Sequence, residues 1–517
     1  MEKEICKSSF KDMGHVESTA EYALADYQGD IKKILSQRAR LFPVGRYTGG
    51  GEFEVAGTVE YTVLYADAEN KLTTAVFASD YAFSMPIDGD RFLSASPEVK
   101  ITGFSLRLGG PRRMSAKCSL SCRALVSELE CFKVEGDALE RTESAQMLEK
   151  SVNVWQTLNS ERTEREYSDE LVRINAPSPD DVTVIASGGS VRILEARAVA
   201  GGVLLVGTVE LTAIVSTPTD SAFAVSKSIP FEEVISLEGA SEGMSAVAEG
   251  LLSSVSISVN DEGDGNISVG ASALADFSAV AHAGEEVSLV CDAYNCDCES
   301  ENTYRTYKYE EHISSGVMPI TLGASVAREE VINGAVRGIL AAYPSVKLLE
   351  ASLAARGMNI CGEMTVNGVA CQENESGEGE YCNFKFTSPI NENVNINCHI
   401  PDGARLDARI IPESASLLLD SGRISAKCDA ALVYLITLPR EIKVLGSSVV
   451  SSDAVPEKRA SSVTVYFPEA GDTLWSVAKR YKSTVQDIAV ANSLSESVMV
   501  DFDRSVGLRS VKKLIVK

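Results

Sequence analysis

An internal repeat of roughly 150 residues constrains the fold of this chain more than any other feature. A glycine-centred block occurs three times, and its glycines Gly57, Gly207 and Gly362 are spaced by 150 and 155 residues. A second block recurs in phase with it, as Arg113–Cys118, Asn266–Val269 and Arg423–Cys428. Two blocks that recur at one period indicate three copies of one domain.

The segments between turns alternate apolar and polar residues and are rich in β-branched side chains, as in Val55–Tyr65, Val203–Val215 and Leu417–Val433. This period of two predicts β-strands. Helical spacing is limited to Asp26–Leu35 and Ser325–Ala342, where we expect helices. The predicted fold class is therefore mainly β, with three repeated antiparallel β-rich domains that contain a few helices, followed by a small α+β domain.

The three matched glycines precede alternating strands. Glycine inside a strand marks a bend or a place where another group comes too close for a side chain. We expect Gly57, Gly207 and Gly362 to occupy such positions.

The period and the composition together suggest the domain boundaries. We predict repeats at 1–150, 151–300 and 301–445, and a C-terminal domain at 463–517. Residues 446–462 are rich in serine and contain glycine and proline, which predicts a flexible linker. A second candidate boundary, Glu135–Asp169, is charged and fits either a helix or a linker.

The C-terminal segment has the pattern strand, turn, helix, helix, strand. Val463, Val465 and Phe467 share one face of the first strand, and Leu474, Val477, Ala478 and Tyr481 form one stripe of the first helix. Asp472 or Thr473 is placed to cap that helix, and Ser483–Gln486 has the spacing of a capping box for the second. Lys513–Val516 reads as the closing strand. The pattern predicts a βααβ domain.

This segment resembles the LysM modules, which bind glycans containing N-acetylglucosamine. The resemblance covers Val463 to Leu494 and includes Asn492 after the second helix. It departs from the family where Lys482-Ser483 follows the first helix and where Val506–Arg509 stands near the C-terminal end. The resemblance implies a binding groove between the loop before the first helix and the loop after the second.

The groove supplies our candidate partner-binding residues. They are Gly471, Asp472, Thr473, Leu474, Trp475, Lys479, Asn492 and Leu494. Trp475 lies off the apolar stripe and fits two interpretations, a residue that shields the small core or an exposed aromatic anchor for a ligand. Lys479, Arg480 and Lys482 add positive charge, which suits an acidic protein surface at least as well as a neutral glycan.

The N-terminal region carries a second resemblance. Ala23–Leu35, the Gly57 block and Val63–Tyr65 are similar to the start of a SPOCS domain, a module of spore coat and sporulation proteins. Three such repeats before one LysM module resemble the clostridial coat-morphogenetic proteins. That resemblance implies a non-enzymatic adaptor in the mother cell, which binds stage IV sporulation protein A, a coat ATPase, at the forespore surface and helps attach the spore coat.

Charge and hydropathy exclude several classes of partner. The net charge is −25 and the pI about 4.7, whereas nucleic-acid binding needs a basic surface. The longest apolar run, Ala198–Val209, has 12 residues, too few to span a membrane, and the start Met1–Glu4 lacks the pattern of a secretory signal. We expect a cytoplasmic protein without a transmembrane segment.

Catalytic and metal-binding motifs are missing from the sequence. It contains no P-loop, no Gly-x-Ser-x-Gly elbow and no His-Glu-x-x-His motif. None of the 12 cysteines has Cys-x-x-Cys spacing, so we interpret most as reduced, buried side chains, with Cys296 and Cys298 as a weaker candidate metal site. We predict no enzyme activity, no cofactor and no metal.

Two functions from different classes stay open. The first is a spore coat adaptor that holds stage IV sporulation protein A through its LysM-like domain. The alternative is a peptidoglycan-binding protein anchored to the cortex or cell wall.

Overall fold

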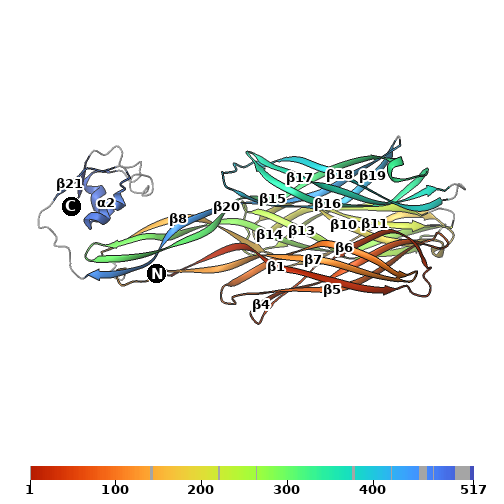
Figure 1. Cartoon of the computed structure of the whole chain (residues 1–517), viewed down its shortest axis with the longest axis horizontal. Coiled ribbons are helices and arrows are strands. Elements are labelled where there is room, and N and C mark those ends of the chain that lie inside the picture. Colours follow the sequence, from red (N-terminus) through yellow and green to blue (C-terminus); the bar gives the residue numbers. More distant parts are fainter. Residues whose placement is uncertain are drawn as a thin grey trace.

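A computed structural model describes residues 2–42, 44–139, 144–218, 222–263, 265–374, 379–420, 422–452, 463–469, 471–494 and 513–516. Antiparallel strands dominate it, as the repeat and the alternation predict. The strands form three β-sandwiches that lie side by side, with a narrow extension at one end and the small C-terminal domain beyond it (Figure 1). None of the described helices is long and apolar enough to cross a membrane.

Repeat 1 pairs a sheet of order β1-β7-β6 with a sheet of order β2-β4-β3, to which β5 adds on β4. Its strands are β1 (Glu2–Ala23), β2 (Ile31–Leu41), β3 (Gly45–Gly49), β4 (Glu52–Asp67), β5 (Leu72–Pro86), β6 (Phe92–Gly110) and β7 (Arg113–Lys133).

Repeat 2 has the same plan, with sheets β13-β14-β8 and β10-β11-β12 and with β9 also paired to β14. Its elements are β8 (Ala145–Asn159), β9 (Thr163–Asn175), the short helix η1 (Pro179–Asp181), β10 (Thr183–Val199), β11 (Gly202–Ser216), β12 (Phe223–Ser236), β13 (Ser245–Asp261) and β14 (Asn266–Asn295).

Repeat 3 has sheets β15-β20-β19 and β16-β17-β18. Its elements are β15 (Glu299–Ala327), α1 (Arg328–Val331), β16 (Val336–Ala354), β17 (Gly357–Glu373), β18 (Gly379–Asn395), β19 (Arg405–Asp420) and β20 (Arg423–Ser452). The three repeats are therefore built alike, each around one long central strand, β7, β14 or β20.

Small residues on these central strands allow the two sheets of each repeat to pack closely. On β7 every second residue from Met114 to Ala124 is buried, and the series includes Cys118 and Cys122. On β20, Cys428 is buried in the same way. Burial raises the pKa of the Cys118 and Cys428 thiols to about 11, so these thiols stay protonated and act as small apolar side chains.

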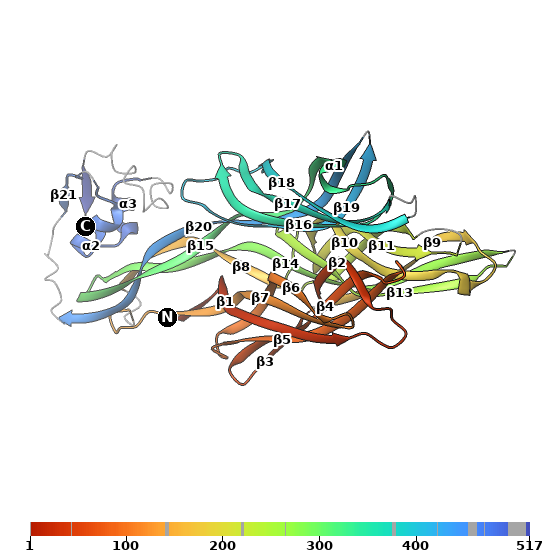
Figure 2. The ribbon, with the colours of Figure 1, turned by 45° about the vertical axis from the view of Figure 1, so that its right-hand side comes forward.

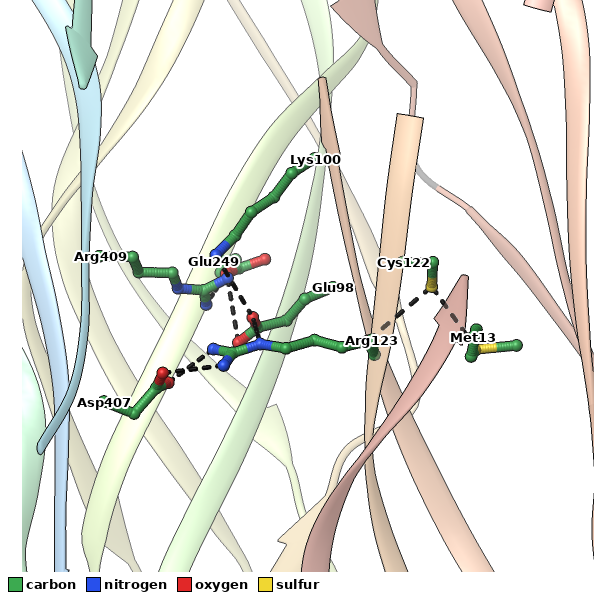
Figure 3. A network of polar contacts seen from close by, with 8 residues as sticks. All are labelled: Met13, Glu98, Lys100, Cys122, Arg123, Glu249, Asp407 and Arg409. Carbon is green, nitrogen blue, oxygen red and sulfur yellow. Dashed lines mark hydrogen bonds and ion pairs between the residues drawn. The ribbon is translucent and has the colours of Figure 1, made fainter. Parts of the chain in front are cut away.

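Equivalent strands of the three repeats meet at a central charged network, which is shown in Figure 3. Three residues occupy equivalent places in the repeats: Glu98 on β6, Glu249 on β13 and Arg409 on β19. Their partners on the central strands are Arg123, Ser278 and Val433, and these partners are spaced by 155 residues. Arg409 forms ion pairs with both glutamates, at 3.2 Å for Glu98. The three repeats therefore surround a common axis, and this buried arginine lies between two carboxylates there.

Further contacts join the repeats in pairs. Arg123 of repeat 1 makes two hydrogen bonds, of 2.8 and 2.5 Å, to Asp407 of repeat 3. Arg192 of repeat 2 lies 3.3 Å from both Glu413 and Asp429 of repeat 3. Arg40 of repeat 1 donates a hydrogen bond to the carbonyl of Leu252 in repeat 2. Each repeat thus contacts both others.

The narrow extension, which we call the stalk, consists of three two-stranded ribbons, one from each repeat (Figures 1 and 2). These are the paired ends of β1 and β7, of β8 and β14, and of β15 and β20. One shared core fills the space between them, made of Ile5, Phe132, Val152, Val154, Val287, Leu289, Tyr307 and Val444. No single repeat contains the partners for its own ribbon.

A polar layer separates the stalk from the sandwiches. Ser127, His282 and Thr437 occupy equivalent positions of β7, β14 and β20, and all three are buried. Ser127 exchanges hydrogen bonds with Ser8 and Thr157, whereas His282 accepts one from the indole of Trp155 and stacks on His312. The layer therefore contains a cluster of hydrogen-bonded hydroxyls and a stacked pair of imidazoles.

Both predicted helices are wrong. Within Asp26–Leu35 the chain turns and then enters β2, and Ser325–Ala342 keeps only the single turn of α1 between β15 and β16. Ile31 and Leu35 are four residues apart, which places them on one face of a helix and also on one face of a strand. Pairing of β2 with β4 selects the strand.

The described part of the predicted linker is strand, and the described part of the charged boundary is mostly strand. Residues 446–452 continue β20 and pair with the start of β15, and 453–462 lie outside the described residues. Glu135–Asp169 contains β8 and part of β9. Serine-rich composition does not prevent a strand when a neighbour supplies its hydrogen bonds.

Replacement of Gly207 by valine should destabilise the protein. A Cβ there would lie 2.1 Å from the carbonyl oxygen of Arg192 and 2.7 Å from the ring of Phe231, and overpacking of this kind costs about 1–3 kcal/mol. Gly338→Val is the control, because a Cβ at that strand position meets nothing within 4 Å. Urea unfolding followed by circular dichroism measures both, and equal midpoints would contradict the steric role of Gly207.

The stability of the protein should fall in acid because of His282. Burial, with a smaller effect of His312, lowers its pKa from 6.5 to about 3. The neutral imidazole makes its full contribution to the free energy of unfolding above pH 6.5. This contribution is lost as the pH falls towards 3, and the free energy of unfolding then falls by up to about 1.4 kcal/mol per pH unit. His282→Thr, which introduces the residue found at the equivalent position Thr437, should flatten this slope. The exposed His399→Thr should not, and an unchanged slope in His282→Thr would refute the assignment.

Candidate functional site

The C-terminal domain has the predicted βααβ order. Strand β21 (Thr464–Tyr466) pairs with β22 (Leu514–Val516), and helices α2 (Leu474–Tyr481) and α3 (Val485–Ala491) lie between them in sequence. Thr473 caps α2 in a capping box with Ser476, and Thr484 caps α3. The core contains Leu474, Val477, Ala478, Val485, Ile488, Leu514 and Val516.

Asn492 ties the second helix to the closing strand. Its side-chain amide donates to the carbonyls of Ile488 and Ile515, and its oxygen accepts from the backbone N–H of Ile515, all at 2.7 Å. These three bonds use most of the hydrogen-bonding capacity of the side chain. Asn492 therefore has a structural role in this domain.

One face of α2 lies against the tip of the stalk. The indole N–H of Trp475 donates a 2.8 Å hydrogen bond to Asp292 of β14, and the ammonium of Lys479 lies 2.6 Å from the other oxygen of the same carboxylate. The Trp475 ring also packs edge-on against Tyr294, with 4.9 Å between the ring centroids. A single acidic residue thus holds two side chains of the helix.

The loop after α2 completes the contact. The hydroxyl of Tyr294 donates to the carbonyl of Ser483 at 2.6 Å, and Lys482 donates to the carbonyl of Cys298 at 3.0 Å. Lys482 also pairs with Glu299 at 3.2 Å. Together with Asp292, these residues form what we call the docking contact.

The electrostatics of Asp292 support this contact. Burial by itself would raise the pKa of this carboxyl group, but hydrogen bonds from Lys479, Trp475 and Tyr304 outweigh it, so the pKa lies below its usual value. The carboxylate therefore stays ionised at neutral pH and in mild acid, and the contact weakens only when the pH falls through that lowered pKa.

The docking contact corrects our picture of the groove. Trp475 is only 7% exposed, because it packs between the core of its own domain and the stalk, so it is not an exposed aromatic in this arrangement, and its role in partner binding stays a prediction. Lys479 and Lys482 are paired with acidic residues of the stalk rather than displayed to solvent. The sequence carried no signal for this contact, because Asp292 and Tyr294 lie about 180 residues before the helix they touch.

The other groove residues fall into two groups. Leu474 is buried in the core and Leu494 packs against it, while Gly471 to Thr473 form the half-exposed turn that starts α2. Asp472 accepts hydrogen bonds from the Tyr466 hydroxyl and from the backbone of Glu469, so it stabilises the turn, while Thr473 is the cap. Partner binding by these residues stays a prediction.

The first strand of the domain presents an apolar surface that we predicted to be core. Val463, Val465 and Phe467 are 60%, 50% and 67% exposed, and Tyr466 faces the helices instead. The alternation does separate two faces, but the face with Val463, Val465 and Phe467 is the exposed one and not the core. Tyr466 can point inward because its hydroxyl reaches Asp472 and Arg480. We call the three exposed side chains the β21 strip.

Metal binding at Cys296 and Cys298 has no support in the geometry. Among the described residues, no group of three or more cysteine, histidine or acidic side chains is arranged to hold a metal ion. Cys298 is buried, and its carbonyl accepts the hydrogen bond from Lys482.

Loss of the Asp292 carboxylate should release the domain from the stalk. In Asp292→Ala, Trp475 loses its hydrogen bond and Lys479 loses its ion pair, so we expect Trp475 to become accessible to water. The protein has two tryptophans and Trp155 is 2% exposed, so acrylamide quenching of the fluorescence reports mainly on Trp475. Quenching should increase in Asp292→Ala and stay at the wild-type level in Asp297→Ala, an exposed neighbour. Equal quenching in all three proteins would contradict the docking contact.

Two family models match the chain. The SipL, SPOCS domain model matches residues 182–260, which run from the start of β10 through β13, and the LysM domain model matches residues 469–501. No curated protein and no solved structure gives a significant match. Both domains are binding domains rather than catalytic ones. The chain thus combines a match to the SipL, SPOCS domain in its second repeat with a match to a C-terminal LysM domain, a combination that fits a spore-coat-associated protein.

Proposed function

We propose that the protein is a non-enzymatic adaptor of the spore coat. Its LysM domain binds stage IV sporulation protein A, the coat ATPase, and its three repeats form a rigid body that helps attach coat to the forespore surface in the mother cell. The combination of SPOCS and LysM domains supports the coat role. The contacts that the LysM domain already makes support a protein ligand over a glycan.

The observation that carries the proposal is the β21 strip. Three apolar side chains that are at least half exposed alternate along the chain, with Val465 in β21 and Val463 and Phe467 just beyond its two ends, and no described residue buries them. An apolar strip of this kind is typical of a protein interface rather than of a sugar site. The turn from Gly471 to Thr473 belongs to the same domain and supplies polar groups for such an interface.

Peptidoglycan binding is the alternative, and the LysM match favours it. The arrangement of α2 weighs against it, because the candidate groove residues Trp475 and Lys479 are engaged by Asp292. A glycan that used this face would have to compete with the docking contact. The apolar strip faces no such competition.

A charge on the β21 strip should weaken partner binding. Phe467→Glu should weaken the complex with purified stage IV sporulation protein A by about 2 kcal/mol or more, the size of an interface hot spot. Val490→Glu is the control, because Val490 is an apolar residue of the same domain that is 74% exposed on α3. Biolayer interferometry with the full-length protein measures both affinities.

A peptidoglycan pull-down of the same variants separates the two functions. The adaptor proposal fails if Phe467→Glu binds the ATPase as tightly as the wild type. Binding of wild-type protein to peptidoglycan, without binding to the ATPase, would support the alternative instead.

A further inference from the structure

A cavity of about 140 Å³ lies where the three repeats meet, next to the network of Figure 3. Repeat 1 contributes Arg46 from β3, and repeat 2 contributes Arg162 from the bend between β8 and β9. Repeat 3 contributes Asp407 and Arg409. The cavity is therefore a property of the assembled repeats rather than of any one of them.

Two of its cations have no counter-charge in contact. Arg409 is paired with Glu98 and Glu249. By contrast, no described residue forms a hydrogen bond or an ion pair with the side chain of Arg46 or Arg162, and the Nε of Arg46 is buried without a partner. Both side chains are half-buried, so their charges are partly removed from water, which is costly unless a counter-charge is present.

In both arginines the effect of burial on the pKa exceeds that of the nearby carboxylates. Burial lowers the pKa of Arg46 and the nearby positive charge of Arg162 lowers it further, while Glu161 and Glu249 offset only part of this effect. Burial also lowers the pKa of Arg162. Both groups stay protonated at neutral pH all the same, because an arginine does not lose its proton under such conditions.

The four carboxylates that line the cavity, Glu98, Glu249, Asp276 and Asp407, are not in ion-pair contact with either arginine. Glu98, Glu249 and Asp407 are engaged by Arg123 and Arg409. Asp276 also lines the cavity and its charge acts on Arg162, but the two side chains are not within ion-pair distance. Burial raises the pKa of Asp276, which shows that this carboxyl group too is incompletely solvated. Among the nearby carboxyl groups, Asp276 acts most strongly on Arg162, ahead of Glu249 and Glu164.

We propose that this cavity binds a phosphoryl oxyanion between Arg46 and Arg162. Each guanidinium presents a planar fork of N–H donors that matches a phosphate group. A phosphate carries up to two negative charges and can neutralise both arginines, whereas a single carboxylate can neutralise only one. Because the two arginines come from different repeats, the bound anion stabilises the junction of repeats 1 and 2.

The test is a phosphate titration of the full-length protein at constant ionic strength, with chloride as the balancing ion. The melting temperature of the wild type should rise and then saturate, because a ligand that binds only the folded state stabilises it. Arg46→Gln and Arg162→Gln should bind phosphate at least about tenfold more weakly. Arg197→Gln, a control at an exposed arginine paired with Glu195, should respond like the wild type.

Two further arms sharpen the result. Asp276→Asn removes the internal competitor and should bind phosphate more tightly than the wild type, which no loss of folding can imitate. Glycerol phosphate in place of inorganic phosphate distinguishes a free ion from a phosphate monoester. The proposal is overturned if the wild type shows no saturable rise beyond that in chloride, or if Arg46→Gln and Arg162→Gln keep the full response.

Discussion

The shared packing of three ribbons in the stalk is the constraint on which the rest of this structure depends. A two-stranded ribbon in water is marginally stable at best. Here each repeat extends its two strands beyond its own sandwich, and the apolar side chains of all three ribbons meet in one core. A chain with one or two repeats would leave that core open. The need to bury it explains why the repeats stand around one axis.

The charged network makes the three repeats different from one another at an equivalent position. Equivalent strand positions hold Glu98, Glu249 and Arg409, so two acids and one base meet where three identical residues would repel one another. Such a buried arrangement favours one order of the repeats over others. Sequence divergence at this position is therefore a requirement of the fold.

Much of the fold could be predicted from the sequence, because repetition and alternation are local signals. The three copies, the antiparallel strands and the βααβ tail follow from them. The helix predicted at Asp26–Leu35 failed because its spacing fits both periods, and pairing with β4 decided between them. The prediction of the buried face of β21 failed for a related reason, because alternation defines the two faces of a strand but does not determine which one is buried.

The candidate site was harder to predict because its decisive contacts are distant in sequence. The capping role of Thr473 was readable from neighbouring residues. The engagement of Trp475 and Lys479 by Asp292 was not, because it depends on how far β14 extends beyond its sandwich. For the same reason, no sequence pattern marks Arg46 and Arg162 as neighbours.

Because the LysM domain and the stalk belong to one chain, the stalk competes with any external ligand for the Trp475 face. Dilution of the protein does not weaken this intramolecular competition. Any ligand that requires the Trp475 face must first populate the undocked form, and its apparent affinity is reduced by the fraction of molecules in that form. The apparent affinity of a ligand for the β21 strip is not reduced in this way by the docking contact. One small domain can therefore bind one partner through the β21 strip at all times, while its Trp475 face binds only a ligand with enough affinity to displace the stalk.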